Sequence, residues 1–421
     1  MLRRHFLGAA LVKVASGKMN PTILVRSGWQ TVNIGDIAHT PGLLAALEKG
    51  IPGAQFILWP SALDRGAEPM LMRRFPKLRI VKGVLGPNGV PDTPEVQEAF
   101  KTGDIFIHGS AASVTAHPQA AAWKKITSKP YGFFGVGFTL GGEAAGTKFS
   151  EAIRPTLNGS SFLFTRETAS LANVKKAGIQ GPELGFAPDG TFSMDITDEE
   201  KANVYLRESG LVEGKFICVV PRLRYTPYHK FRKVDWTPEE ILRRDTANDK
   251  YAEQDHAKLR EAVIAFVRKT GGKALLCPEM TYEIDIIDPL LYDPLPDDVK
   301  RSVVRRKTYW LPDEASSIYK RAVAVISSEC HSPILAAVQG TPCMYVHQPE
   351  DGIKGHMWND IGLGDWFFEI EQSTGAGIAK RVLEIHAQGG KARQKVRDAV
   401  KFAQATQAAR VAFIRDKVLN R

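Results

Sequence analysis

The stretch AVAVISSECHSPILAAVQGTPCMYV, Ala322–Val346, decides the fold of this chain. Its first part, Ala322–Ser327, is apolar and typical of a buried strand, and Cys343–Val346 has the same character. Between them a helix is expected over Pro333–Gln339, because proline suits the first helical turn and a glycine follows the last helical residue. A strand, a helix and another strand in this order predict two parallel strands joined by a right-handed crossover.

His331 lies where open α/β sheets bind ligands, beyond the carboxyl end of a strand. The adjoining helix N-terminus offers free N–H groups, and its dipole favours anions. Because imidazole gains and loses a proton near neutral pH, His331 is a candidate general acid. A buried histidine that caps main-chain groups fits the pattern equally well. We discount its neighbour Cys330 as a nucleophile, because adjacent side chains diverge and the sequence indicates no acid to orient it.

The same alternation of strands and helices continues on both sides of this stretch. In the first half, a helix is expected from Thr40, as its cap, to Lys49. A charged, helix-like linker is expected at 195–214, after which the pattern restarts. Apolar strands are expected at 22–26, 55–59, 79–81, 104–108, 131–136, 162–165, 215–220 and 274–277. The chain is therefore predicted to be an α/β protein of the GT-B type. Two Rossmann-like domains, at 20–194 and 215–421, would face each other across a cleft, and the second would carry a helical tail.

Composition restricts the classes of function. With 421 residues the chain is too long for one hydrophobic core, and no apolar run is long enough to cross a bilayer. Its net charge of +10 favours anionic ligands such as phosphates, nucleotides or acidic glycans. Zinc-finger spacing and RNA-binding aromatic motifs are missing, so nucleic acid is not an expected partner. The sequence leaves the oligomeric state open.

The first 19 residues have the features of a leader. Arg3-Arg4-His5-Phe6-Leu7 resembles the start of a twin-arginine export signal, and a short apolar stretch follows it. Lys13 interrupts that stretch, and Met19 could be the true first residue. Residues 1–19 are therefore left out of the predicted fold, and whether they are cleaved stays open.

Two further turns of the first half follow strands and carry polar residues. Asn33, Gly35 and Asp36 could hold a ligand, although an Asx turn that caps a helix is the slightly better interpretation. Arg166 follows the strand at 162–165, where a guanidinium could bind a carboxylate or phosphate through two hydrogen bonds. A surface salt bridge of Arg166 with Glu167 is the alternative.

Other polar residues also follow predicted strands. Arg222 and Arg224 come after the first strand of the second half, either as ligand contacts or as part of a basic loop. His108 ends the strand at 104–108 and could face the cleft. The four cysteines form no metal-binding spacing, so we expect buried thiols and no metal ion. The glycines lack a dinucleotide or Walker pattern, which argues against a nicotinamide cofactor.

Taken together, these segments resemble the polysaccharide pyruvyl transferase family. The resemblance extends from about Arg26 to Leu363, and it rests on four short motifs that occur in the order of the family. They are Asn33-Ile-Gly35-Asp36, Lys129-Pro130 with Gly135 and Gly137, Thr165–Ser170 with Lys176–Ile179, and Ser327–His331 with Gly340-Thr341-Pro342.

The resemblance implies transfer of a pyruvyl group from phosphoenolpyruvate to two hydroxyls of a sugar, giving a cyclic ketal. It further implies a bacterial enzyme of polysaccharide biosynthesis, acting on exopolysaccharide or cell-envelope glycans. His331 would give a proton to the enol carbon, and Arg166 would hold the carboxylate or phosphate of the donor. Phosphoenolpyruvate would be a co-substrate, so no cofactor is expected. The expected partners are an anionic donor and a glycan acceptor.

The matched block that ends at His331 also contains Ser328 and Glu329 as candidate substrate contacts. Glu329 stands where the family commonly has an arginine. Arg222, Arg224 or Lys354 would then have to supply the missing cation for the donor phosphate.

Two other functions stay open. The chain could be a nucleotide-sugar glycosyltransferase, in which Glu329 would bond a ribose, or a non-catalytic glycan-binding protein that has kept the fold. The compartment is open as well. Phosphoenolpyruvate is a cytoplasmic metabolite, whereas the twin-arginine-like N-terminus favours export.

Overall fold

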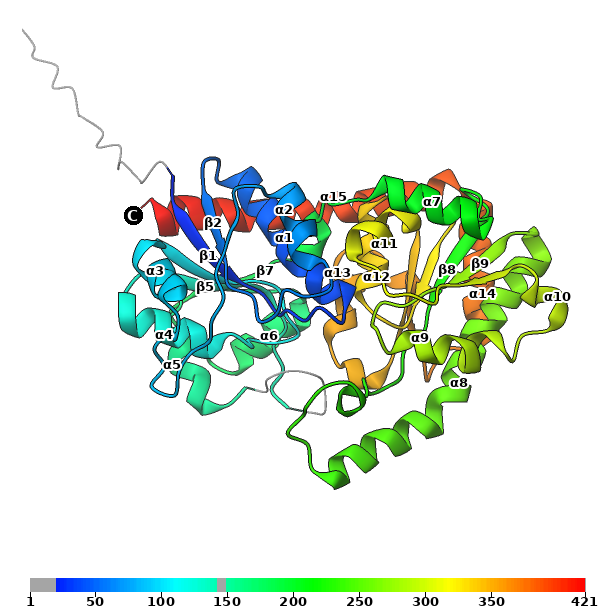
Figure 1. The fold of residues 1–421 in the computed structure, drawn as a ribbon, viewed down its shortest axis with the longest axis horizontal. Coiled ribbons are helices and arrows are strands. Elements are labelled where there is room, and N and C mark those ends of the chain that lie inside the picture. The colour runs from blue at the N-terminus through cyan, green and yellow to red at the C-terminus, as the bar shows by residue number, and fades with distance from the viewer. Residues whose placement is uncertain (1–19, 142–148, 421) are drawn as a thin grey trace, which may run out of the picture.

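A computed structural model describes residues 20–141 and 149–420 of the chain, which form two lobes (Figure 1). The predicted leader at 1–19 lies outside the described residues. Each lobe is built on one parallel sheet with helices packed against it. Within the described part of the chain, no helix combines the length and the apolar composition needed to cross a membrane.

The N-terminal lobe contains a seven-stranded parallel sheet in the order β3-β2-β1-β4-β5-β6-β7. Its central strands are apolar and almost wholly buried, as expected for a parallel sheet covered on both faces. The strands are β1 (Thr22–Arg26), β2 (Gln55–Leu58), β3 (Arg79–Ile80), β4 (Ile105–His108), β5 (Tyr131–Val136), β6 (Phe162–Thr165) and β7 (Glu183–Phe186). The helices are α1 (Ile34–Gly50), α2 (Ala67–Arg74), α3 (Pro94–Thr102), α4 (His117–Thr127), α5 (Arg154–Asn158) and α6 (Thr168–Lys176).

The C-terminal lobe contains a six-stranded parallel sheet in the order β10-β9-β8-β11-β12-β13. Its strands are β8 (Phe216–Val220), β9 (Lys273–Leu276), β10 (Val303–Arg305), β11 (Val325–Ser327), β12 (Cys343–His347) and β13 (Phe367–Glu369). The helices are α7 (Glu199–Ser209), α8 (Pro238–Thr270), α9 (Glu283–Ile286), α10 (Asp297–Lys300), α11 (Pro312–Tyr319), α12 (His331–Val338), α13 (Met357–Asp360), α14 (Gly375–Gln388) and α15 (Gly390–Phe413).

The chain passes between the lobes twice. It first crosses after β7, where α7 packs against α11 of the C-terminal lobe. It then returns along α15, which spans both lobes and brings the C-terminus back to the N-terminal lobe (Figure 1). There Phe413 meets Phe164 of β6 edge to face, and Arg410 donates a hydrogen bond to the carbonyl of Phe186 at the end of β7. The helical tail therefore completes the packing of the first sheet.

The predicted α/β fold with two facing parallel sheets is confirmed, but the predicted start of α1 at Thr40 is wrong. The helix begins at Ile34, and Asn33 is its cap, because the Asn33 side-chain oxygen accepts hydrogen bonds from the N–H groups of Gly35 and Asp36. Pro41 therefore lies inside the helix. Proline removes one main-chain hydrogen bond there, and the burial of the first turn offsets that loss.

Candidate functional site

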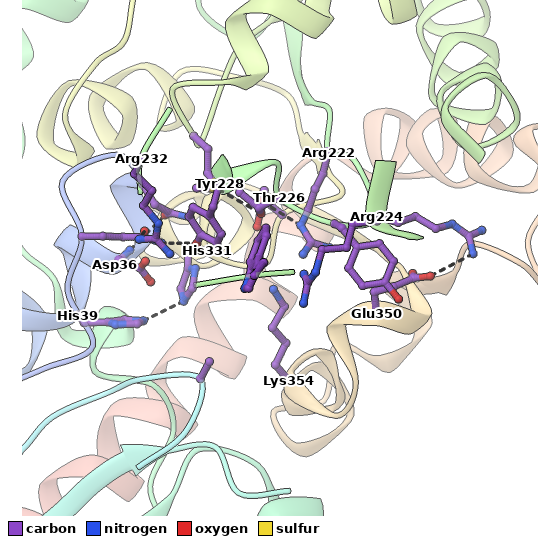
Figure 2. A pocket seen from close by; sticks show the side chains of 18 of the residues that line it. Asp36, His39, Arg222, Arg224, Thr226, Tyr228, Arg232, His331, Glu350 and Lys354 are labelled. Carbon is purple, nitrogen blue, oxygen red and sulfur yellow. Dashed lines mark hydrogen bonds and ion pairs between the residues drawn. The ribbon is translucent and has the colours of Figure 1, made fainter. Parts of the chain in front are cut away.

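A cavity of about 640 Å³ lies between the lobes, beyond the carboxyl ends of both sheets. Cationic side chains outnumber carboxylates along its wall, so the cavity suits an anionic ligand. The described cations that line it are Arg166, Arg222, Arg224, Arg232, Arg243, Arg244 and Lys354, and the described carboxylates are Asp36, Glu240, Glu329 and Glu350. Figure 2 shows His331 at the wall of this cavity, with His39 pointing toward it.

His331 is the first residue of α12 and follows the turn after β11. Its Nδ1 lies 3.2 Å from Oε1 of Glu279, and the other oxygen of Glu279 accepts the N–H of Ser332 at 2.6 Å. Glu279 therefore fixes both the imidazole and the N-terminus of α12. Burial alone would lower the pKa of His331, but the adjacent Cys330 and Glu279 outweigh it, and the pKa of His331 lies well above its usual range.

His39 approaches His331 from α1 of the other lobe. The Nε2 atoms of the two imidazoles are 2.9 Å apart, and Nδ1 of His39 lies 3.0 Å from the carbonyl oxygen of Gly28. A carbonyl oxygen only accepts, so Nδ1 of His39 carries a proton. Glu279, whose pKa is lowered by His331 and Ser332 against the effect of its burial, likewise accepts the Nδ1 proton of His331. With its pKa raised, His331 carries a further proton on Nε2, and the two rings share this proton across the 2.9 Å between their Nε2 atoms.

Asp189 connects the two lobes at this point. Its Oδ2 lies 3.4 Å from Nε2 of His39, 3.9 Å from Nε2 of His331 and 3.5 Å from Nη1 of Arg166. Its Oδ1 accepts the N–H of Thr191 at 3.0 Å. Burial raises the pKa of Asp189, but the neighbouring cations outweigh it, so the pKa lies well below its usual range and the group is ionised. His331 and Arg166, the two predicted catalytic residues, thus meet on one carboxylate.

Arg166 is almost wholly buried, although it lines the cavity. Its Nε lies 2.6 Å from Oε1 of Glu167, whose other oxygen accepts the hydroxyl of Ser170 at 2.6 Å. The salt bridge with Glu167 that the sequence offered as the alternative interpretation is therefore present, but it is inside the protein and not on its surface. Glu167 and Asp189 together hold the guanidinium in a fixed orientation.

Glu329 is paired with a cation. Its Oε1 lies 2.9 Å from Nε of Arg222, and Asp351 lies 2.8 Å from Arg222 and 2.6 Å from Lys354. Burial raises the pKa of Glu329 to about 7, and Arg222 opposes that increase. Arg224 forms its own ion pair with Asp255, 2.9 Å away. All three predicted replacement cations thus line the cavity, and each already has a carboxylate partner.

The remaining predicted residues lie in different surroundings. Asp36 lines the cavity, whereas Asn33 lines it and also caps α1. Gly35 lies against His331 so closely that a Cβ atom there would be 2.3 Å from the imidazole. Ser328 is buried behind the cavity wall and donates its N–H to the carbonyl of Val220 at 3.1 Å.

His108 is not among the described residues that line the cavity. Its Nδ1 lies 3.0 Å from the carbonyl oxygen of Arg26, and its Nε2 accepts the N–H of Ala116 at 3.2 Å. Burial lowers its pKa to about 4, so the ring is neutral and serves the packing of the N-terminal lobe.

Sequence reasoning missed several residues of the site. His39 lay between the predicted loop and the predicted helix, and Asp189 follows β7, a strand that was not predicted. Glu279 could have been found, because an acid just after the predicted strand at 274–277 falls at the same sheet edge as His331.

An aromatic and cationic wall was missed as well. The guanidinium of Arg232 lies 3.5 Å from the centre of the Tyr228 ring, and that of Arg244 lies 4.2 Å from the centre of the Trp236 ring. These residues lie in a loop and at the start of α8, where no strand or helix period marks the residues that face a ligand.

Solved structures with the same architecture come from several enzymes. A Listeria monocytogenes protein described as a UDP-N-acetylglucosamine 2-epimerase is 11% identical, with a TM-score of 0.61 over 94% of this chain and 96% of that one. Anabaena HepE in complex with UDP is 13% identical, with a TM-score of 0.55 over 94% and 99%. Medicago truncatula UGT71G1 complexed with UDP-glucose is 8% identical, with a TM-score of 0.53 over 95% and 98%. These likenesses show a GT-B-like fold of two Rossmann-like domains.

No curated protein matches the chain significantly. The family model of polysaccharide pyruvyl transferases, in contrast, matches residues 33–346, which is most of the chain. The matched region contains His39, Arg166, Asp189, Glu279 and His331, the residues that meet between the lobes. The chain therefore belongs to the polysaccharide pyruvyl transferase family.

Proposed function

We propose that the protein transfers a pyruvyl group from phosphoenolpyruvate to two hydroxyls of a sugar in this cavity. The observation that carries the proposal is the meeting of His331 and Arg166, from different lobes, on the carboxylate of Asp189. This arrangement puts an acid and a fixed guanidinium at one end of a strongly cationic cavity, which is what a small dianionic or trianionic donor requires.

In the proposed reaction, His331 gives a proton from Nε2 to the methylene carbon of phosphoenolpyruvate. Positive charge then develops at C2, a sugar hydroxyl bonds to C2, and the bond from C2 to the phosphate oxygen breaks. A second hydroxyl closes the ketal. One of the two hydroxyl protons restores His331 and the other leaves with phosphate, so the reaction balances. Arg166 would hold the donor carboxylate, and Arg222 with Lys354 would face the phosphate.

The aromatic wall supports a sugar as the acceptor. Tyr228 and Trp236 line the same cavity, and aromatic rings offer apolar faces on which the C–H groups of a pyranose can pack. Arg232 and Arg244, which cover these rings, would bind acidic substituents of the glycan.

Release of phosphate from phosphoenolpyruvate, measured with and without a panel of oligosaccharide acceptors, tests the proposal. We expect release only with an acceptor, and a loss of about 100-fold or more in His331→Gln, the range expected for a positioned acid. His386→Gln is the matched control, because His386 is exposed on α14. Calorimetry that detects no binding of phosphoenolpyruvate would contradict the proposal.

A second function, transfer from a nucleotide-sugar, is favoured by the ligands of the structural neighbours. Anabaena HepE was solved with UDP and Medicago UGT71G1 with UDP-glucose. Thermal unfolding in the presence of UDP or phosphoenolpyruvate separates the two functions. Stabilisation by UDP alone would favour the glycosyltransferase, and stabilisation by phosphoenolpyruvate alone would favour the pyruvyl transferase.

A further inference from the structure

We propose that His39, Asp189 and His331 form a binding site for a divalent transition-metal ion of the zinc class. Two imidazole nitrogens and one carboxylate oxygen, supplied by both lobes, converge on one point at the cavity wall. The proposal rests on the geometry of these three side chains and does not depend on pyruvyl transfer.

The distances fit ligands of one ion. The three ligand atoms are separated by 2.9 Å, 3.4 Å and 3.9 Å. Ligand atoms that each lie about 2.1 Å from a zinc ion are roughly 3.0 to 3.4 Å apart. Two of the three separations therefore agree closely, and the third needs only a small movement of Asp189 or His331.

The orientation of the two rings also fits. The ring planes of His39 and His331 cross at 71°, and their centroids are 4.7 Å apart. If the two nitrogens and the two ring centres lay on one line, the centroids would be separated by the 2.9 Å between the nitrogens plus two ring radii. The observed centroid separation is shorter than that sum. The lone pairs of the two Nε2 atoms therefore meet at an angle, as they do when both point at a third atom.

Both imidazoles are already held in the form that binds metal. A metal-ligating histidine typically donates its other ring N–H to a main-chain carbonyl or to a carboxylate. His39 makes the first kind of contact, with Gly28, and His331 makes the second, with Glu279. The second oxygen of Asp189 is held by the N–H of Thr191, and Oδ2 faces the two imidazoles with Nη1 of Arg166 3.5 Å away.

Charge and burial are compatible with a dication. The carboxylates of Asp189 and Glu279 face the two imidazoles, and the nearby cation Arg166 is paired with both Glu167 and Asp189. All three ligand residues are buried, yet His39 and His331 line the cavity, so an ion would keep coordination positions open to it. Two nitrogen ligands favour zinc, iron or cobalt over magnesium and calcium, which prefer oxygen.

A metal ion and the shared proton would occupy the same lone pairs. If His331 is the acid of the proposed pyruvyl transfer, the ion removes that acid, and Zn²⁺ would inhibit the reaction in proportion to its occupancy. This one consequence rests on the proposed function, whereas binding itself does not.

Isothermal titration of the full chain with ZnCl₂, after dialysis against EDTA and then metal-free buffer, tests the site. We expect one ion per chain, release of protons that depends on the ionisation enthalpy of the buffer, and no binding of Mg²⁺ at the same concentration. His39→Gln and Asp189→Asn should each weaken zinc binding at least tenfold, and Glu279→Gln, which removes only the support of His331, should weaken it about 10- to 100-fold. His386→Gln, on α14, should bind as the wild type does.

Circular dichroism of each variant checks that it is folded. If the wild type takes up no zinc, or if a folded His39→Gln, Asp189→Asn double variant binds it as tightly as the wild type, the site is disproved. Phosphate release assayed on the same metal-free samples keeps the two proposals apart. Zinc binding without transfer would overturn only the proposed function, and transfer without zinc binding would overturn only the metal site.

Discussion

At the scale of single residues, the site depends on how closely Gly35 approaches His331. The lack of a side chain at Gly35 lets the first turn of α1 lie directly against the imidazole. His39, one turn further along α1, is thereby brought within hydrogen-bond distance of His331. A glycine that the sequence places in an ordinary turn thus sets the distance between the two histidines.

Gly35→Ala should displace His331. The added Cβ would lie 2.3 Å from the ring, so either the imidazole or the helix must move. We expect a loss of roughly 1–3 kcal/mol of unfolding free energy from overpacking and a matching loss of zinc affinity and phosphate release. Gly390→Ala, in the first turn of α15 with nothing within 4 Å of the new Cβ, is the control and should be neutral or slightly stabilising. Equal effects of the two substitutions in urea denaturation would contradict this account.

Glu329→Gln tests what the acid does in an anion-binding cavity. The substitution removes the carboxylate 2.9 Å from Nε of Arg222, so that this edge of the guanidinium can bind a ligand phosphate while Nη1 stays paired with Asp351. We expect phosphoenolpyruvate to bind about 3- to 10-fold more tightly, which corresponds to roughly 1 kcal/mol of removed repulsion. Glu208→Gln, on α7 outside the cavity, is the control. Weaker binding in Glu329→Gln, measured by calorimetry, would instead make Glu329 a ligand contact, as the glycosyltransferase function requires.

His108 gives the stability of the protein a specific dependence on pH. Its folded pKa of about 4 lies below the usual value of 6.5, because burial disfavours the charged ring. Between pH 6.5 and 4 the imidazole of His108 is protonated in the unfolded chain but neutral in the folded chain, so the free energy of unfolding falls as the pH falls. The total effect is on the order of 3 kcal/mol. Unfolding free energies of the wild type and of His108→Gln should therefore converge toward pH 4, and a constant difference would exclude this role.

At the scale of elements, the sequence predicts the interior strands of both sheets and the edge strand β3, but it misses the other three edge strands. Strands such as β5 and β8 are buried and therefore consist of continuous apolar runs. Their ends lie within one residue of the predicted bounds. The edge strands β7, β10 and β13 are short and only half buried, so no continuous apolar run marks them. Asp189 was missed for this reason, since it follows an edge strand.

The start of α1 shows a second limit. Both Asn33 and Thr40 are plausible caps, and the local pattern around Pro41 favours the later one. The earlier start is stabilised by the contact of Gly35 with His331, some 300 residues away, which no local pattern contains.

The positions of His331 and Arg166, in contrast, could be predicted, because each residue follows an apolar strand at the sheet edge where ligands bind. The sequence predicts no metal ion because the cysteines lack metal-binding spacing. The three proposed metal ligands are far apart in sequence, so no spacing pattern reveals them.

Asn33→Ala should measure the cap directly. Its side chain satisfies two N–H groups of the first turn, and their loss should cost about 1 kcal/mol of unfolding free energy. Asn33→Asp retains an acceptor and should recover most of that stability. Thr40→Ala, well inside the helix, should cost less than Asn33→Ala if the helix begins where the structure places it. Chemical denaturation of the three variants and the wild type gives the order of their unfolding free energies.

At the scale of the whole molecule, α15 links the tail of the chain to the site. Gln407 of α15 donates hydrogen bonds to the carbonyls of Pro188 and Asp189, at 3.1 Å and 2.7 Å, and accepts one from Ser193. The last helix therefore holds the main chain that carries the Asp189 carboxylate. Gln407 thereby positions the carboxylate that lies close to both His39 and His331.

Gln407→Ala should weaken both the fold and the site. It removes one donor from each of the buried carbonyls of Pro188 and Asp189, although the N–H of Phe192 still donates to the second. This loss should cost about 1–3 kcal/mol of unfolding free energy, and it loosens the segment that positions Asp189. We expect zinc affinity to fall in parallel with stability. Gln394→Ala, exposed on the same helix, should change neither quantity. Unchanged zinc binding in a destabilised Gln407→Ala would show that Asp189 is held by its own loop.

The double passage of the chain between the lobes also restricts how the molecule can move. Two covalent connections, one after β7 and one along α15, join the lobes and restrict their relative rotation more than a single connection would. Because His39 and His331 belong to different lobes, any change in the angle between the lobes would change the spacing of their nitrogens. The two connections that hold the lobes together therefore also hold the two imidazole nitrogens at their observed spacing.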